Sequence, residues 1–251
     1  MMMDYRMAAV WLLAPALMAA PVAAQEMNRR AQSEVTEIWE PVPRSVATTE
    51  GQPPSDAVVL FDGTGFDAWE AEQGGQIGWS LEEDAMTVAS GSGGIRTKEA
   101  FCDVQLHVEW RTPSETAGFD GQDRGNSGIF LQERYEIQVL DSSDNATYAN
   151  GQAGSVYKQH PPLVNASRAP GEWQSYDILF DAPIFSEHGA LRRPAYVTVL
   201  QNGVVVQNHA QIQGPTVWIG APSYEAHGCA PIFLQDHNSD VSYRNIWLRP
   251  I

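Results

Sequence analysis

Basic residues are scarce in this sequence, which holds 15 Lys and Arg against 31 Asp and Glu and has a net charge of −16. Nucleic acids and anionic membrane surfaces both attract basic proteins, so this acidic excess argues against either as a partner. With 43% hydrophobic and 18% charged residues, the chain still has enough apolar material for a packed core. The balance is typical of an exported protein that acts on a neutral ligand.

Long apolar runs are also missing, except for one near the start of the chain. Residues 7–20 form an apolar stretch that follows a short segment with one cation, Arg6. An apolar helix of that length spans about 21 Å, short of the hydrocarbon core of a bilayer at ~30 Å. Small residues lead up to Ala24. The pattern predicts a secretory signal peptide over residues 1–24 and a periplasmic or secreted protein.

Only two cysteines are present, Cys102 and Cys229. They can pair in an oxidising compartment, and the sequence leaves open a bridge or two buried thiols. Neither belongs to a C-x-x-C motif or has a histidine beside it to activate it, so no thiol nucleophile is predicted. Glycine-rich nucleotide loops, the G-x-S-x-G elbow, H-E-x-x-H and the EF-hand loop are absent as well. The six histidines do not have the spacing of a metal site.

Composition changes near residue 56. Residues 25–55 are rich in Glu, Thr, Pro and Ser and predict a leader or linker, with a short helix near Val35–Trp39. Residues 56–251 alternate short β-rich segments with Gly, Asn, Pro and Asp, which predicts one domain. Phe101–Arg111 shows the clearest alternation of apolar and polar residues. Asn202-Gly203, between two apolar runs, is typical of a type I′ hairpin turn.

About a dozen short strands with frequent turns predict an all-β fold, an antiparallel sandwich or jelly roll. The expected strands are Ala57–Phe61, Trp79–Leu81, Ala85–Ala89, Phe101–Arg111, Ser127–Leu131, Tyr135–Leu140, Ser155–Tyr157, Gln174–Phe180, Ala195–Leu200, Val204–Gln207, Thr216–Ile219, Pro231–His237 and Val241–Arg249.

The segment Asn126–Asp141 has the strongest chemical pattern. If Ile137 and its apolar neighbours pack inward, Glu136 and Gln138 share the other face of the strand, about 6.5–7 Å apart. Asp141 has the wrong parity for that face, but one bulge near residue 140 would bring it round. An acid, an amide and an acid facing a groove can bind sugar hydroxyls and move protons. The alternative is a surface strand with solvated polar side chains.

Two further segments offer candidates. Gln235 and His237 share a strand face, and a histidine beside an amide is either functional or simply a hydrogen-bonded structural residue. The proline-rich segment Ser155–Trp173 contains Lys158 and ends at Trp173. Such a loop can line a groove and stack on a sugar ring, or it can be a plain crossover between strands.

Five segments resemble one family in sequence and order: LFDGTGFDAWE (60–70), NSGIFLQERYEIQVLD (126–141), GEWQSYDILF (171–180), VTVLQNGVVVQ (197–207) and FLQDHNSDVSYRNIWL (233–248). Together they resemble the bacterial 3-keto-disaccharide hydrolase domain, formerly a domain of unknown function. Its members are also described as 3-keto-glucoside 1,2-lyases and 3-keto-2-hydroxy-glucal hydratases. The resemblance covers residues 56–251 and implies a concanavalin A-like jelly-roll β-sandwich, similar in fold to laminarinase-type glycoside hydrolases.

The resemblance to laminarinase-type enzymes is incomplete at their catalytic strand, which has the pattern Glu-x-Asp-x-x-Glu. Here the matching positions are Glu136, Gln138 and Asp141, so the central acid is an amide and the last acid is one methylene shorter. A retaining glycosidase needs two suitably poised carboxyls about 5–5.5 Å apart. The departure therefore weakens an ordinary retaining mechanism.

What the resemblance implies is cleavage of 3-keto-glycosides by elimination followed by hydration, a net hydrolysis of the glycosidic bond. A ketone at C3 acidifies the hydrogen on C2, so a base, an enolate stabiliser and a proton donor suffice. We expect Glu136 or His237 as the base and Asp141 as the proton partner or orienter.

The expected substrate contacts are polar or aromatic: Asn126, Gln138 and Gln235 for hydroxyls or the keto oxygen, Trp173 for stacking, Lys158 for the enolate charge, and Arg111 as a secondary candidate. A divalent metal ion held by Glu136, Asp141 and His237 is an alternative to Lys158. The expected partner is a glycoside or oligosaccharide, with a sugar 3-oxidoreductase upstream to make the ketone. A non-catalytic carbohydrate-binding module or lectin and an ordinary retaining glycosidase stay open as alternatives.

Overall fold

The computed structural model describes residues 29–251, so the signal peptide expected over residues 1–24 lies outside the described residues. The chain divides into two units, Met1–Ser45 and Val46–Ile251. In the first unit, residues 29–34 are helical and a turn begins at Val35, so the helix expected near Val35–Trp39 is wrong. β-Branched residues and two prolines follow residue 34, and both disfavour a helix there. No helix among the described residues is long and apolar enough to span a bilayer.

The second unit begins before the expected boundary at residue 56. The backbone N–H of Ser55 donates to the carbonyl of Ala47 at 3.0 Å, and the Arg249 Nε donates to Asp56 at 2.8 Å. Residues 46–55 therefore fold with the β-domain rather than with the leader.

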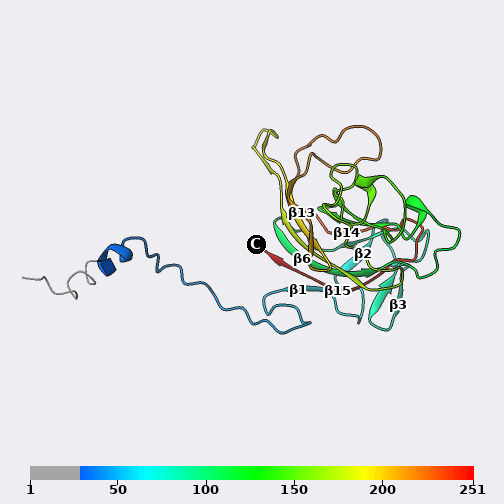
Figure 1. Ribbon diagram of the computed structural model, residues 1–251, viewed down its shortest axis with the longest axis horizontal. Coiled ribbons are helices and arrows are strands. Elements are labelled where there is room, and N and C mark those ends of the chain that lie inside the picture. The colour runs from blue at the N-terminus through cyan, green and yellow to red at the C-terminus, as the bar shows by residue number, and fades with distance from the viewer. Residues whose placement is uncertain (1–28) are drawn as a thin grey trace, which may run out of the picture. The chain divides into compact units, whose positions relative to one another are not determined.

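The β-domain consists of two antiparallel sheets and one small hairpin (Figure 1). The larger sheet holds β1 (Val58–Phe61), β3 (Ser80–Glu82), β4 (Ala85–Thr87), β6 (Val104–Arg111), β9 (Gln174–Asp181), β12 (Tyr196–Gln201), β13 (Val204–Gln211) and β15 (Ser242–Pro250). Its order is β13-β12-β9-β6-β15-β4-β3, and β1 also pairs with β15. The smaller sheet has the order β2-β5-β14-β7-β8. The predicted all-β, concanavalin A-like jelly-roll sandwich is thus confirmed.

The smaller sheet consists of five short strands. It is built from β2 (Trp69–Ala71), β5 (Ile95–Thr97), β7 (Ser127–Leu131), β8 (Tyr135–Val139) and β14 (Phe233–Leu234). The small hairpin is formed by β10 (Ile184–Phe185) and β11 (Leu191–Arg193).

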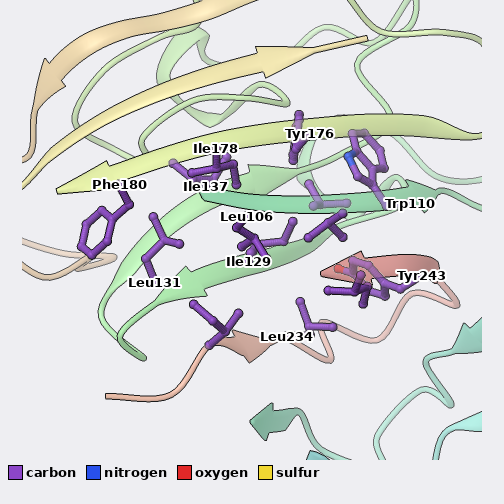
Figure 2. Packing of buried hydrophobic residues seen from close by; sticks show 14 of the residues in the cluster. Leu106, Trp110, Ile129, Leu131, Ile137, Tyr176, Ile178, Phe180, Leu234 and Tyr243 are labelled. Carbon is purple, nitrogen blue, oxygen red and sulfur yellow. The ribbon is translucent and has the colours of Figure 1, made fainter. Parts of the chain in front are cut away.

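Alternating apolar residues fill the space between the two sheets. In β6, Leu106 and its apolar neighbours at every second position are fully buried, and the intervening polar residues are half-buried. Figure 2 shows Leu106 and Ile178 of the larger sheet in one cluster with Ile129 and Ile137 of the smaller sheet. Because side chains alternate along a strand, the residues next to Ile129 and Ile137 face away from this core.

Two of the expected strands are not strands in the structure. Residues 155–157 make only isolated bridges through Val156, and residues 216–219 form an irregular loop. Gly and Pro flank the second segment, and no neighbouring strand pairs with it, so its apolar residues have no sheet to join. The hairpin at Asn202-Gly203 is confirmed: both residues have positive φ, 52° and 80°, as a type I′ turn requires.

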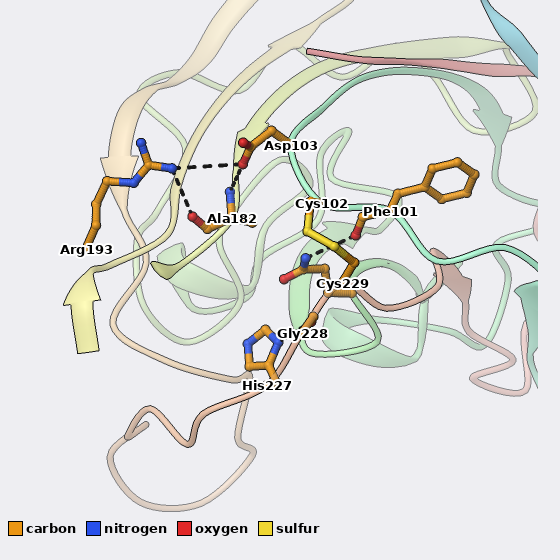
Figure 3. The surroundings of a disulfide bond; sticks show 9 residues. Phe101, Cys102, Asp103, Ala182, Arg193, His227, Gly228 and Cys229 are labelled. Atoms are coloured by element: carbon orange, nitrogen blue, oxygen red, sulfur yellow. Dashed lines mark hydrogen bonds and ion pairs between the residues drawn. A yellow bond between two sulfur atoms is a disulfide. The ribbon is translucent and has the colours of Figure 1, made fainter. Parts of the chain in front are cut away.

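Cys102 and Cys229 form a disulfide bond (Figure 3). The bond ties the segment before β6 to the segment before β14 across a sequence separation of 127 residues. Beside it, the Gln132 amide donates to the carbonyl of Phe101 at 3.1 Å. Closing so long a loop reduces the entropy of the unfolded chain and is worth about 4–5 kcal/mol on a chain-entropy basis.

Candidate active site

A pocket of about 220 Å³ lies on the face of the smaller sheet that points away from the core. Strands β7 and β8 pair in register, so that Phe130 lies opposite Glu136 and Gly128 lies opposite Gln138. The pocket is lined by Asn126, Phe130, Glu136, Gln138, Tyr157, Thr216, Trp218, Gln235 and His237. Five of the expected site residues therefore meet in one place: Asn126, Glu136, Gln138, Gln235 and His237.

This pocket is not the largest hollow, but it is distinguished by its chemistry. Hollows of about 440 and 490 Å³ adjoin β1 on the larger sheet. The acidic side chains that line them are exposed or half-buried, whereas only 4% of Glu136 is exposed. A buried carboxyl in a polar pocket is the arrangement that shifts pKa values for proton transfer.

The carboxyl group of Glu136 occupies space that a glycine leaves open. A Cβ atom added at Gly128 would lie 2.6 Å from Oε1 of Glu136 and 2.8 Å from Cε2 of Phe130. Real Cβ atoms do not approach heavy atoms that closely, so any larger residue would displace the carboxyl. The glycine at position 128 of β7 thus leaves room for the Glu136 carboxyl on this face of the sheet.

Burial raises the pKa of Glu136 from 4.5 to about 8. Removing a carboxylate from water penalises its charged form, which explains the direction of the shift. At pH 7 this side chain is mostly protonated, and near pH 8 it exchanges its proton readily. Such a group can act as a proton donor or, once ionised, as a base stronger than an exposed carboxylate.

The amide of Gln138 has acceptors on both sides. With its nitrogen toward the carbonyl oxygen of Ser127 and Oε1 of Glu136, it donates to them at 3.1 and 3.0 Å, and its oxygen then lies 3.1 Å from Oε1 of Gln122. A donor beside a carboxylate favours its ionised form, but burial prevails at Glu136 and raises its pKa. The backbone carbonyl of Gln138 accepts a bond of 2.7 Å from the Tyr176 hydroxyl, which anchors β8 to the larger sheet.

Gln235 brings an unused acceptor to the pocket. Its Oε1 is buried, and no residue among those described donates to it. A buried acceptor without a donor is costly, and a hydroxyl group of a ligand would satisfy it. Asn126 lies across the pocket and is fixed by its side-chain donation to Gln122 O at 2.7 Å. His237 is exposed among the pocket-lining residues, where water or a ligand reaches its imidazole.

Three aromatic residues that were not among the expected site residues also line the pocket: Phe130, Tyr157 and Trp218. Trp218 is 74% exposed although it lines the pocket, so its indole is free to stack. The hydroxyl of Tyr157 is hydrogen-bonded to that of Tyr148 at 2.6 Å. The Lys158 ammonium lies 4.4 Å from the centre of the Tyr148 ring and is not among the lining residues.

Asp141 does not join Glu136 and Gln138. Strand β8 ends at Val139, and Asp141 is not among the residues that line the pocket. Its carboxylate instead accepts from Nε of Arg124 at 2.6 Å and lines a neighbouring hollow. The acid–amide–acid set therefore reduces to Glu136 and Gln138 at this pocket.

Trp173 and Arg111 also lie outside the lining of the pocket. The Trp173 ring contacts two guanidinium groups, with Arg111 at 4.7 Å and Arg244 at 4.2 Å from its centre. A ring already covered by cations has little free face for a sugar, so Trp218 is the better stacking surface. In the sequence, Trp218 lies in a short apolar segment between Gly-Pro and Gly. The pattern of this segment predicted a strand rather than a loop that lines a pocket.

The three side chains expected to share a divalent ion do not converge. Glu136 and His237 line the pocket, whereas Asp141 is bound to Arg124 elsewhere. Within residues 29–251, no three His, Cys, Asp or Glu side chains are grouped so as to hold a metal ion. The residues present thus do not fit the expected three-ligand site, and the chemistry below is derived from side chains alone.

The family match and a solved relative identify a glycosyl hydrolase-like, carbohydrate-active protein, in agreement with the jelly-roll fold and this polar, aromatic-rimmed pocket. The chain belongs to the family of the 3-keto-alpha-glucoside-1,2-lyase-like domain, whose family model matches residues 56–249. The family expected from the five sequence segments is confirmed by this match. No curated protein matches the chain.

Solved structures from Parabacteroides distasonis agree with this assignment. One protein, provisionally named as a glycosyl hydrolase, is 50% identical with a TM-score of 0.82, over 87% of this chain and 96% of that one. A second, also provisionally named as a glycosyl hydrolase, is 21% identical with a TM-score of 0.58, over 78% of this chain and 94% of that one. The second similarity supports the fold alone.

Proposed function

We propose that the protein cleaves 3-keto-glycosides by elimination across C1 and C2, followed by addition of water. The observation that carries the proposal is Glu136, a buried carboxyl with a pKa of about 8 in a pocket lined by amides. Membership of the 3-keto-alpha-glucoside-1,2-lyase-like family supports the choice of substrate.

The bonds change in two stages. A base removes the proton from C2, the electrons move toward the C3 oxygen, and the enolate expels the oxygen substituent from C1. The leaving oxygen takes up a proton, and a double bond joins C1 to C2. Water then adds across this bond, with hydroxyl going to C1 and hydrogen to C2, so the net change is hydrolysis. The route needs one base, one acid and donors for the enolate oxygen.

Glu136 is the base in this proposal. Its raised pKa makes its carboxylate more basic than an exposed one, and it is still substantially ionised near pH 8. The amide of Gln138 donates to Glu136 and keeps the carboxylate oriented. His237, which is exposed at the same pocket, donates the proton to the leaving oxygen. Asp141 does not fill this role, because it is paired with Arg124 outside the pocket.

The remaining lining residues bind the sugar. The Asn126 amide and the Gln235 acceptor meet the keto oxygen and the ring hydroxyls, and Trp218 stacks on the ring. Because charge develops on the C3 oxygen, fixed amide donors there lower the barrier more than they tighten ground-state binding.

We also propose that the protein is exported to the periplasm or secreted. A disulfide between Cys102 and Cys229 suits an oxidising compartment, in line with the signal peptide expected over residues 1–24. The substrate also requires that an oxidoreductase acting on the C3 hydroxyl has come first. Fractionation of cells that express the full chain tests the location, and protein found only in the cytoplasm would contradict it.

Matched substrates test the reaction itself. Purified protein is incubated with a native disaccharide and with the same disaccharide oxidised at C3, and products are followed by mass. We expect cleavage of the oxidised sugar alone. Cleavage of the native sugar would instead indicate an ordinary glycosidase, and binding without cleavage of either would indicate a carbohydrate-binding module.

A further inference from the structure

A second hollow of about 270 Å³ adjoins the active-site pocket. The pocket and the hollow are lined by residues that are consecutive in the chain. Asn126 and His237 line the pocket, whereas the next residues along the chain, Gly125 and Asn238, line the hollow. The backbone N–H of Asn126 also donates to the hydroxyl of Ser239 at 3.3 Å, which joins a residue of the pocket to a residue of the hollow.

The floor of the hollow is a rigid ion pair. Asp141 is 1% exposed and accepts from Nε of Arg124 at 2.6 Å. The other two guanidinium nitrogens of Arg124 donate to the carbonyl oxygens of Ser143 and Asp144, at 3.1 and 3.3 Å. The positive charge is thus neutralised and each guanidinium nitrogen has an acceptor, so the floor offers shape rather than an anion-binding charge.

The walls combine an aromatic ring with carboxylates. Phe119 is 54% exposed although it lines the hollow, so its ring is available to pack on a ligand. The Glu115, Asp123 and Asp240 side chains are exposed around it. Carboxylates accept hydrogen bonds from hydroxyl groups and repel anions, and this combination selects a neutral, hydroxylated ring.

We propose that this hollow is the subsite for the leaving group, and that it binds a neutral second sugar ring attached at C1 of the oxidised ring. The inference rests on the proposed function for its orientation, since the pocket with Glu136 takes the oxidised ring. Each hollow alone is smaller than the ~300 Å³ at which ligand pockets commonly begin, and the two together fall within that range.

Calorimetric binding tests the subsite without relying on turnover. In a Glu136→Gln background, a 3-keto-disaccharide is compared with methyl 3-keto-glucoside, which has no second ring. We expect the disaccharide to bind about tenfold more tightly, and Phe119→Ala to weaken it about five- to tenfold without affecting the methyl glycoside. Leu179→Ala, at an exposed apolar residue of the larger sheet, is the matched control and leaves both affinities unchanged.

The contrary outcomes are distinct. Equal affinity for the two ligands, an equal loss for both in Phe119→Ala, or no binding of either would overturn the subsite. Failure of the wild-type protein to turn over oxidised sugars would overturn the proposed function instead, and the binding comparison would still decide the subsite.

Charge selection gives an independent readout. A 3-keto-disaccharide with a uronic acid as its second ring should bind at least fivefold more weakly than one with glucose there. Asp123→Asn combined with Asp240→Asn, or 0.5 M salt, should reduce this difference. Equal binding of the acidic and neutral rings to the Glu136→Gln protein would contradict selection by the carboxylates.

Discussion

Gln138 donates from its amide nitrogen to Oε1 of Glu136 at 3.0 Å, from the same face of β8. Burial favours the protonated carboxyl, whereas this donation favours the ionised one. Burial prevails at Glu136 and raises its pKa to about 8. In a laminarinase-type strand the middle position is an acid, which competes with its neighbouring acid for a proton. The amide of Gln138 at this position instead donates a hydrogen bond to Glu136.

The pH dependence of turnover should follow the ionisation of Glu136. Because the base must be ionised, the acidic side of the kcat/KM profile for a 3-keto-glycoside should rise with pH through an apparent pKa of about 8. Glu136→Gln should lose at least 100-fold in kcat. Initial rates between pH 6 and 9.5 check both, and a flat profile or near wild-type turnover by Glu136→Gln would remove Glu136 as the base.

The free energy of unfolding should also depend on the ionisation of Glu136, and ionisation should lower it. The pKa of Glu136 is about 8 in the folded protein against 4.5 for the free side chain. The folded state therefore binds the proton more tightly, and the free energy of unfolding falls as pH rises from about 4.5 to about 8. Glu136→Gln removes this loss and should be more stable than wild type by roughly 3–5 kcal/mol above pH 8.

Denaturant unfolding at pH 5 and pH 8.5 measures this difference. Glu225→Gln removes an exposed carboxyl and is the control, with little expected change at either pH. If Glu136→Gln were no more stable relative to wild type at pH 8.5 than at pH 5, the raised pKa would be wrong.

Gly128 should be required for turnover rather than for folding. Gly128→Ala places a methyl group where Oε1 of Glu136 lies, so the carboxyl must move. A displacement of about 1 Å at a reacting group can cost about 100-fold in rate, and we expect a fall of 10- to 100-fold in kcat. Gly65→Ala, which meets nothing within 4 Å, is the control. Circular dichroism checks the fold, and an active Gly128→Ala protein would contradict the tight fit.

Trp218 should contribute to substrate binding. Trp218→Ala removes the exposed indole of the pocket and should raise KM about five- to tenfold with little change in kcat, because stacking persists from ground state to transition state. Trp218→Phe should recover most of the affinity. Trp173→Ala, which removes a ring held by Arg111 and Arg244, should leave KM unchanged. The reverse pattern would return the stacking role to Trp173.

Strand periodicity predicted most of the strands, although not β2 or β5 of the smaller sheet, and it grouped part of the pocket lining. The alternation around Ile137 placed Glu136 and Gln138 on one face, and the same rule paired Gln235 with His237. These four side chains come from segments about 100 residues apart, and their convergence follows from the pairing of β14 with β7. That pairing is a long-range contact and leaves no local signal.

The residues whose positions the sequence pattern did not predict lie in loops. Trp218 lies in an irregular segment whose apolar pattern resembles a strand, and its position depends on the bond of 2.7 Å from the Thr216 N–H to Arg134 O. The expected position of Asp141 required a bulge in the strand. Its ion-pair partner, Arg124, lies 17 residues earlier in another loop. Ion pairs between loops are decided by tertiary structure, which periodicity does not report.

Deuterium uptake at C2 tests elimination most directly. The wild-type protein cleaves a 3-keto-disaccharide in D₂O, and the released keto sugar is examined by mass and proton NMR at the earliest turnover, beside substrate kept in D₂O without protein. Addition of solvent across the C1–C2 double bond should leave one deuterium on C2 of every product molecule. A product that keeps the original hydrogen at C2 would show that the glycosidic bond breaks without proton removal by Glu136, and would contradict the mechanism.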